Sequence, residues 1–325
     1  MLSRFALLLN AVLLGAQTVA PPAATPVFPA GRFYAPYIMP RPAPDLAPGF
    51  LSSLSDASGI RYFTLAFIIG GSDGSCQATW GGRTSLEQET GLSAAITDLR
   101  SHGGDILISF GGEAGKELAI GCETPEKLAA QYQAVIDKYK LAVLDMDIEG
   151  TAIKDPGSVD RRNAALALVQ AANPGVQVTY TLPVNPDGLA RTGVALLVNA
   201  MQRGVKVAVV NLMTMDYGAS ADPASMGPHA ISAVNGATAQ MLDNGIRARL
   251  GIIPMIGNND VKPEVFTLAD AKQVADWAQA NPVVVRMSMW SVSRDNGCAD
   301  GAARGQCSGV PQGIFDFSKI LGAFH

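Results

Sequence analysis

The feature of this sequence that most constrains its fold is a regular alternation of two kinds of segment between residues 31 and 325. Short apolar or β-branched runs, typical of buried strands, lie at Phe33–Ile38, Tyr62–Ile69, Asp105–Phe110, Leu141–Ile148, Val176–Leu182, Val207–Met215, Arg249–Ile256 and Val283–Trp290. Segments with helical spacing lie between them, at Leu92–Ser101, Pro125–Tyr139, Arg161–Asn173, Gly193–Arg203, Ile231–Asn244 and Leu268–Asn281. This alternation predicts a single-domain (β/α)8 barrel, with a doubly wound open sheet as the weaker alternative.

The first 20 residues are typical of a secretory signal peptide. Arg4 precedes an apolar run from Phe5 to Gly15, and small residues follow up to Ala20. This run is shorter than the roughly 20 apolar residues that span a bilayer. We therefore expect cleavage near Ala20 and export without a membrane anchor, a Pro/Ala-rich leader at residues 21–30, and a barrel at residues 31–325.

Composition argues against several classes of function. The 24 Lys and Arg residues against 28 Asp and Glu residues give a net charge of −4, which does not suit a nucleic-acid-binding protein. No glycine-rich nucleotide motif follows a predicted strand, so we expect no cofactor. The three histidines and four cysteines show no zinc-binding spacing, so we expect no metal.

Export would place the cysteines in an oxidising compartment, which favours disulfides. Cys298 and Cys307 lie close in sequence within a Gly-rich loop, so their pairing is preferred, and it leaves Cys76 with Cys122. Four cysteines allow three connectivities, so this pairing is a hypothesis.

Three acidic residues alternate with apolar ones in the predicted fourth strand and directly after it, over Leu144–Gly150. Because side chains switch faces at each strand residue, Asp145, Asp147 and Glu149 should all point into the barrel, at the end where barrel enzymes have their active sites. Crowded carboxylates raise the pKa of at least one of their number, which can keep it protonated near neutral pH. A protonated Glu149 at the barrel mouth predicts a general acid for glycoside hydrolysis.

These residues resemble the glycoside hydrolase family 18 chitinases of the compact bacterial type, over essentially the whole chain after the signal peptide. The four matching segments are LDMDIEG at 144–150, similar to the family's DxxDxDxE signature, SFGG at 109–112, similar to its SxGG box, VVNLMTMDYG at 209–218, similar to its strand-six box, and SMWS at 288–291, similar to its closing strand. Two departures are visible. The first Asp of the signature falls on Ala142, deeper in the barrel than the chemistry, so we expect activity to survive. Tyr217 follows Asp216, and Met215 stands where many members have Tyr.

The resemblance implies that the substrate's own acetamido oxygen attacks the anomeric carbon, with net retention and no carboxylate nucleophile. Glu149 would protonate the glycosidic oxygen and then activate water, Asp147 would stabilise the acetamido group, and Asp145 would share a proton with Asp147. If the sixth strand runs straight, Tyr217 shares its parity with Asn211, Met213 and Met215, and its hydroxyl reaches the acetamido carbonyl.

Further residues are expected to bind the sugar. Trp290 would stack under the reacting ring, and Trp80, in a Gly-flanked loop, is a candidate for another subsite. The remaining predicted contacts are Met215, Asp216, Asn211, Ser109, Gly111, Gly112 and Tyr34, although the two glycines and Ser109 have a plain alternative as a tight turn and Tyr37 competes with Tyr34. Trp277 is expected to pack a helix on the barrel, and Arg294 and Asp295 to brace the loop of Trp290.

Together with the signal peptide, the resemblance therefore implies a secreted, monomeric hydrolase that cleaves β-1,4 linkages between N-acetylglucosamine units of chitin or its oligosaccharides. An endo-β-N-acetylglucosaminidase acting on glycoprotein or peptidoglycan glycans is the alternative within the same chemistry. A chitinase-like lectin typically lacks the acid, whereas Glu149 is present. Only Gly257–Thr267 separates the seventh strand from the next helix, which leaves no room for the insertion that deepens the cleft of processive members, so we expect an open groove and non-processive endo cleavage.

Overall fold

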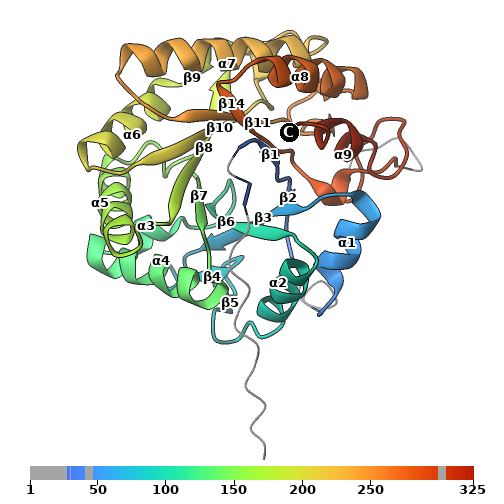
Figure 1. The fold of residues 1–325 in the computed structure, drawn as a ribbon. Coiled ribbons are helices and arrows are strands. Elements are labelled where there is room, and N and C mark those ends of the chain that lie inside the picture. Colours follow the sequence, from blue (N-terminus) through green and yellow to red (C-terminus); the bar gives the residue numbers. More distant parts are fainter. Residues whose placement is uncertain (1–27, 30, 41–46, 299–304) are drawn as a thin grey trace, which may run out of the picture.

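The computed structural model describes residues 28–29, 31–40, 47–298 and 305–325. Parallel strands alternate with helices along this part of the chain, as predicted (Figure 1). The long parallel strands are β3 (Tyr62–Ile69), β6 (Asp105–Gly111), β7 (Val143–Asp147), β8 (Gln177–Asn185), β10 (Val207–Met213), β11 (Arg249–Ile253) and β14 (Val284–Met287). The predicted signal peptide and most of the predicted leader lie outside the described residues.

The first strand closes the barrel in two pieces. The predicted segment Phe33–Ile38 is divided into β1 (Phe33–Tyr34), which pairs in parallel with β14, and β2 (Tyr37–Ile38), which pairs in parallel with β3. Pro36 lies in the break and has no N–H to donate to a neighbouring strand. Because the same short segment joins the first and last long strands, the sheet closes on itself. The predicted barrel is confirmed and the open-sheet alternative is wrong.

Helices form a ring around the strands (Figure 1). Their bounds are α1 Phe50–Ser58, α2 Leu92–Ser101, α3 Leu118–Gly121, α4 Pro125–Tyr139, α5 Pro156–Ala172, α6 Arg191–Gln202, α7 Met226–Asp243, α8 Leu268–Ala280 and α9 Asp316–Leu321. Their starts follow local chemistry: the Thr124 side chain caps α4 and Asp155 caps α5, each directly before a proline, and Thr267 begins α8 with a capping box. The predicted bounds of α2 and α4 match, whereas α5 and α7 begin earlier than predicted.

Short hairpins decorate the ends of the parallel strands. β4 (Thr79–Trp80) and β5 (Thr84–Ser85) extend the sheet from β3, β9 (Gly188–Leu189) folds back on β8, and β12 (Gly257–Asn258) pairs with β13 (Val265–Phe266) after β11. These pieces were absent from the sequence prediction.

Both predicted disulfides are present. Cys76 pairs with Cys122 at a Cα separation of 4.5 Å, joining the segment after β3 to the end of α3. Cys298 pairs with Cys307 at 5.3 Å. Among the described residues, no helix combines the length and apolar character needed to cross a bilayer.

Candidate active site

Asp145 is the anchor of a polar network inside the barrel. It is 1% exposed, and its carboxylate accepts hydrogen bonds from side chains of five different residues. The donors are the Tyr37 hydroxyl at 2.7 Å, Ser109 Oγ at 2.8 Å, Thr179 Oγ1 at 2.6 Å, Thr181 Oγ1 at 2.9 Å and Asn211 Nδ2 at 3.1 Å. These donors come from β2, β6, β8 and β10, so the network ties most of the barrel to one carboxylate.

Asp147 and Glu149 lie toward the mouth of the barrel and are hydrogen-bonded to each other. Asp147 is buried, and its Oδ1 has no hydrogen-bond partner among the described residues. Burial, followed by the charges of Glu149 and Asp145, raises the pKa of Asp147 well above its ordinary value. Burial raises the pKa of Glu149 to about 7, the charges of Glu113 and Asp216 act in the same direction, and the hydrogen bond from Asp147 opposes them. The pair therefore retains a proton near neutral pH.

Two glycines allow the chain to pass beside the acidic strand. The backbone φ angles of Gly111 and Gly112 are +101° and +85°, which side-chain-bearing residues rarely adopt. A Cβ on Gly111 would lie 2.1 Å from the Asp147 carbonyl oxygen, and a Cβ on Gly112 would lie 2.8 Å from the Phe67 ring. The N–H of Gly112 also donates to the Asp147 carbonyl at 2.9 Å. Glycine is thus required for both the position of Asp147 and the space that Phe67 fills.

An apolar floor adjoins the carboxylates. The Trp290 ring stacks on Phe67 with centroids 5.8 Å apart and an interplanar angle of 16°, and it lies 5.9 Å from the Tyr37 ring. Met215 belongs to the same cluster and is buried. Because the Tyr37 hydroxyl binds Asp145, this one residue joins the aromatic floor to the acidic network.

Asp216 follows β10 with a φ of +49°, in the left-handed region. One of its carboxylate oxygens accepts from the backbone N–H of Val261 at 2.8 Å. Burial is the largest cause of its raised pKa, and Asp260 and Glu264 also raise it. The negative charge of Asp216 is among the causes that raise the pKa of Glu149, so the two carboxylates interact electrostatically. Among the described residues, no group of His, Cys, Asp and Glu side chains is suited to hold a metal ion.

No family model matches the sequence. The chain is 36% identical over 282 residues to a probable bifunctional chitinase/lysozyme of Escherichia coli K12, covering 81% of this chain and 31% of that protein. It is 35% identical over 282 residues to endochitinase 11 of Metarhizium anisopliae, of which it spans 52%. The catalytic domain of a hyperthermophilic chitinase from Pyrococcus furiosus superposes with a TM-score of 0.81 at 33% identity, covering 93% of this chain and 97% of that one.

The chain belongs to the family 18 chitinases. The structure brings together most of the residues predicted from the family motifs. The residues in or next to this cluster are Asp145, Asp147, Glu149, Ser109, Gly111, Gly112, Asn211, Met215, Asp216 and Trp290. The chain spans about a third of the length of the Escherichia coli relative and about half of the length of the Metarhizium anisopliae relative.

Tyr217 is not placed with this cluster. The prediction assumed a straight strand, but β10 ends at Met213 and the left-handed turn at Asp216 changes which way the following side chain points. Tyr217 is 6% exposed and packs edge-on against His229 of α7, with ring centroids 5.9 Å apart. Burial and the charge of Glu264 raise its pKa. The expected contact with an acetamido carbonyl is therefore not supported by its position.

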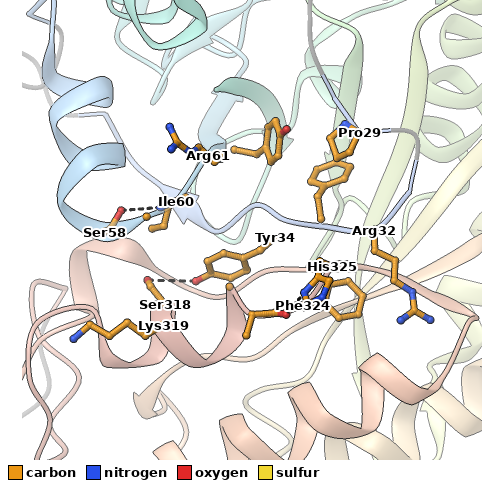
Figure 2. A pocket seen from close by; sticks show the side chains of 15 residues that line it. Pro29, Arg32, Tyr34, Ser58, Ile60, Arg61, Ser318, Lys319, Phe324 and His325 are labelled. Atoms are coloured by element: carbon orange, nitrogen blue, oxygen red, sulfur yellow. Dashed lines mark hydrogen bonds between the residues drawn. The ribbon is translucent and has the colours of Figure 1, made fainter. Parts of the chain in front are cut away.

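Tyr34 and Trp80 also lie apart from the cluster. Tyr34 points toward α9, with its hydroxyl 3.5 Å from Ser318 Oγ, and lines a hollow near the starts of β1 and β3 (Figure 2). Its competitor Tyr37 is the first-strand tyrosine that faces the carboxylates. The Trp80 indole N–H donates to the Tyr139 hydroxyl of α4 at 2.9 Å, and its ring packs edge-on to the same tyrosine. The structure thus assigns Trp80 to packing against the helix layer.

The sequence motifs did not reveal three side chains of the site, those of Thr179, Thr181 and Phe67. Thr179 and Thr181 bind Asp145 and alternate with buried apolar residues along β8, so the polar positions of that strand carried a usable signal. Phe67 is sandwiched between Gly112 and Trp290 and had no such signal in the apolar strand β3.

The remaining structural expectations hold. Trp277 packs on the core, the Arg294 guanidinium donates to the Ile256 and Asn258 carbonyls, and Asp295 accepts the N–H groups of Phe317 and Ser318.

Proposed function

We propose that the protein hydrolyses β-1,4 linkages between N-acetylglucosamine units of chitin with net retention, using the substrate's acetamido group as the nucleophile. The observation that carries this proposal is the hydrogen-bonded Asp147–Glu149 pair, which retains a proton near neutral pH beside an aromatic floor. Catalytic-site variants of the related Pyrococcus furiosus domain, 34% identical to this chain, were crystallised with chito-oligosaccharides. A chain of N-acetylglucosamine units is accordingly the substrate that we propose here.

Each carboxylate has a distinct part in this mechanism. Glu149, neutral below about pH 7, donates its proton to the glycosidic oxygen as the bond from that oxygen to the anomeric carbon breaks. The acetamido oxygen bonds to the same carbon, and the positive charge of the resulting oxazolinium ion is stabilised by Asp147, whose Oδ1 is available to accept the acetamido N–H. The Glu149 carboxylate then takes a proton from water, which adds to the anomeric carbon and releases the acetamido group.

The role that we propose for Asp145 differs from the predicted one, which was to share a proton with Asp147. Its oxygens are occupied by hydroxyl and amide donors, while Asp147 is hydrogen-bonded to Glu149. In the proposed mechanism Asp145 holds the floor of the site, and its negative charge helps to raise the pKa of Asp147.

The proposal includes an open groove, non-processive endo cleavage, action as a monomer and secretion after cleavage near Ala20. Between the end of β11 and the start of α8 at Leu268, a stretch that the structure describes in full, the chain forms the short β12–β13 hairpin and no larger inserted domain. This short connection supports an open groove. A steep loss of viscosity early in digestion of a long soluble substrate would support endo cleavage, whereas release of dimers with unchanged viscosity would contradict it.

The test is incubation of residues 21–325 with N-acetylglucosamine hexamer, with Glu149→Gln alongside, following product sizes and anomers. We expect β-anomeric products from the wild type, a variant slower by about 10²–10⁴-fold, and a wild-type kcat/KM that declines above about pH 7 as Glu149 loses its proton. An inert hexamer combined with cleavage of an N-glycan would instead support the endo-β-N-acetylglucosaminidase alternative. Binding without cleavage of either substrate would support a lectin.

A further inference from the structure

Three consecutive backbone N–H groups after β10 are bound by side chains from another loop. The N–H of Asp216 donates to Asn259 Oδ1 at 3.2 Å. The N–H groups of Tyr217 and Gly218 donate to the two carboxylate oxygens of Glu264, at 3.0 and 2.6 Å. Asn259 and Glu264 both belong to the hairpin loop between β12 and β13, so one short loop holds the whole turn that carries Asp216.

Both supporting side chains are themselves fixed. Asn259 is fully buried, and its amide donates to the Met255 and Gly257 carbonyls at 2.9 and 3.2 Å. Glu264 is 2% exposed, and its carboxylate receives charge-assisted bonds from two N–H groups, which are among the stronger hydrogen bonds in proteins. The hairpin loop is closed by a bond from the Asn259 N–H to the Glu264 carbonyl at 3.0 Å. This support is rigid because each polar group is occupied.

The turn that Asn259 and Glu264 support has an unusual backbone conformation. Asp216 is a non-glycine residue at a φ of +49°, a conformation that persists only when surrounding contacts determine it. The same hairpin loop also binds the Asp216 side chain, through the N–H of Val261. Backbone and carboxylate are therefore held together, and the left-handed turn directs Asp216 to the mouth while Tyr217 enters the core.

The charged groups around this turn define what Asp216 acts on. Glu149 is faced by Asp147 from β7, by Glu113 from the loop after β6 and by Asp216 from the loop after β10. Asp216 is in turn faced by Asp260, Glu264 and Arg294. Displacing Asp216 would alter the electrostatic field at Glu149 without touching the hydrogen bond between Glu149 and Asp147.

We propose that Glu264 and Asn259 are positioning residues of the active site: they fix the backbone of Asp216 and so hold its carboxylate beside Glu149. This inference rests on the proposed function, in which Glu149 is the proton donor. Neither residue is proposed to touch the substrate. Their effect on the reaction passes through Asp216.

The test compares Glu264→Gln with Glu89→Gln. Glu89 is also 2% exposed and also accepts a backbone N–H, at the start of α2, but it binds the Tyr139 hydroxyl on the helix layer. We expect Glu264→Gln to move the basic limb of the kcat/KM profile on hexamer down by about half a pH unit, because moving the Asp216 charge away makes Glu149 a stronger acid. Glu89→Gln should leave the profile unchanged.

A double variant separates positioning from a direct charge effect. In an Asp216→Asn background, Glu264→Gln should cause no further movement of the profile. A Glu264→Gln profile that coincides with the wild type, or an effect that persists without the Asp216 charge, would overturn the proposal. If Glu264→Gln does not fold, Asn259→Ser removes the support at the Asp216 N–H and is expected to move the limb in the same direction.

A crystal structure of the variant provides a readout that does not depend on activity. Release of Asp216 from its left-handed conformation would support the positioning role, and an unmoved Asp216 would refute it. An inert wild-type enzyme would count against the proposed function alone, so the two failures are distinguishable.

Discussion

Replacing Glu149 with Gln should stabilise the protein at alkaline pH while it abolishes the proposed acid. Burial raises the pKa of Glu149 from 4.5 to about 7, so between these values the folded protein holds a proton that the unfolded chain has lost. The stability that depends on this proton is fully present below pH 4.5 and is lost as the pH rises through about 7. Each pKa unit corresponds to about 1.4 kcal/mol, so the wild type should lose about 3 kcal/mol across this window.

Glu149→Gln has no such proton to lose. The amide keeps the shape of the side chain and can still hydrogen-bond to Asp147. Urea unfolding of both proteins at pH 4 and pH 8 measures the effect: the two free energies of unfolding should be similar at pH 4, and the variant should be more stable by about 3 kcal/mol at pH 8. If the two proteins differ in free energy of unfolding by the same amount at both pH values, the conclusion that ionisation of the buried Glu149 destabilises the folded protein is refuted.

Two further substitutions probe the frame of the site. Gly111→Ala places a methyl group 2.1 Å from the Asp147 carbonyl at an unfavourable φ, so it should cost about 2–3 kcal/mol and reduce kcat on hexamer, whereas Gly175→Ala, with open space around it, should do neither. Removing the Cys76–Cys122 disulfide, which joins residues 46 apart, should cost about 4 kcal/mol by the chain-entropy model, measured as a lower Tm of the double Ala variant. An unchanged Tm would show that the reduced chain is already constrained there.

The barrel could be predicted because its signals are periodic and local. β3, α2 and α4 have the predicted bounds, since each combines a continuous apolar pattern with turn or capping residues at its ends. The alternation that placed Asp145 and Asp147 on one face also holds, because β7 runs straight through both. Regular backbone carries the parity of side chains reliably from one residue to the next.

The incorrect assignments occur where the backbone is irregular. Tyr34 and Tyr37 are separated by the break at Pro36, so position in the strand did not reveal which of them faces the acids. Tyr217 follows Asp216, whose left-handed backbone turns the Tyr217 side chain away from the side that a straight strand predicts. The hydrogen bonds that hold this turn go to Glu264, 47 residues from Tyr217. Long-range support of this kind has no local pattern, so only the folded structure discloses it.

The divided first strand has a consequence for how the chain is made. β1 pairs with β14 and β2 pairs with β3, each through two residue pairs, so the seam of the barrel joins an early segment of the chain to a late one. During synthesis the sheet must remain open until residues 284–287 have left the ribosome. Until that moment its unpaired edges can pair with other chains. Release of the last barrel strand therefore ends the period in which the nascent protein is most exposed to aggregation.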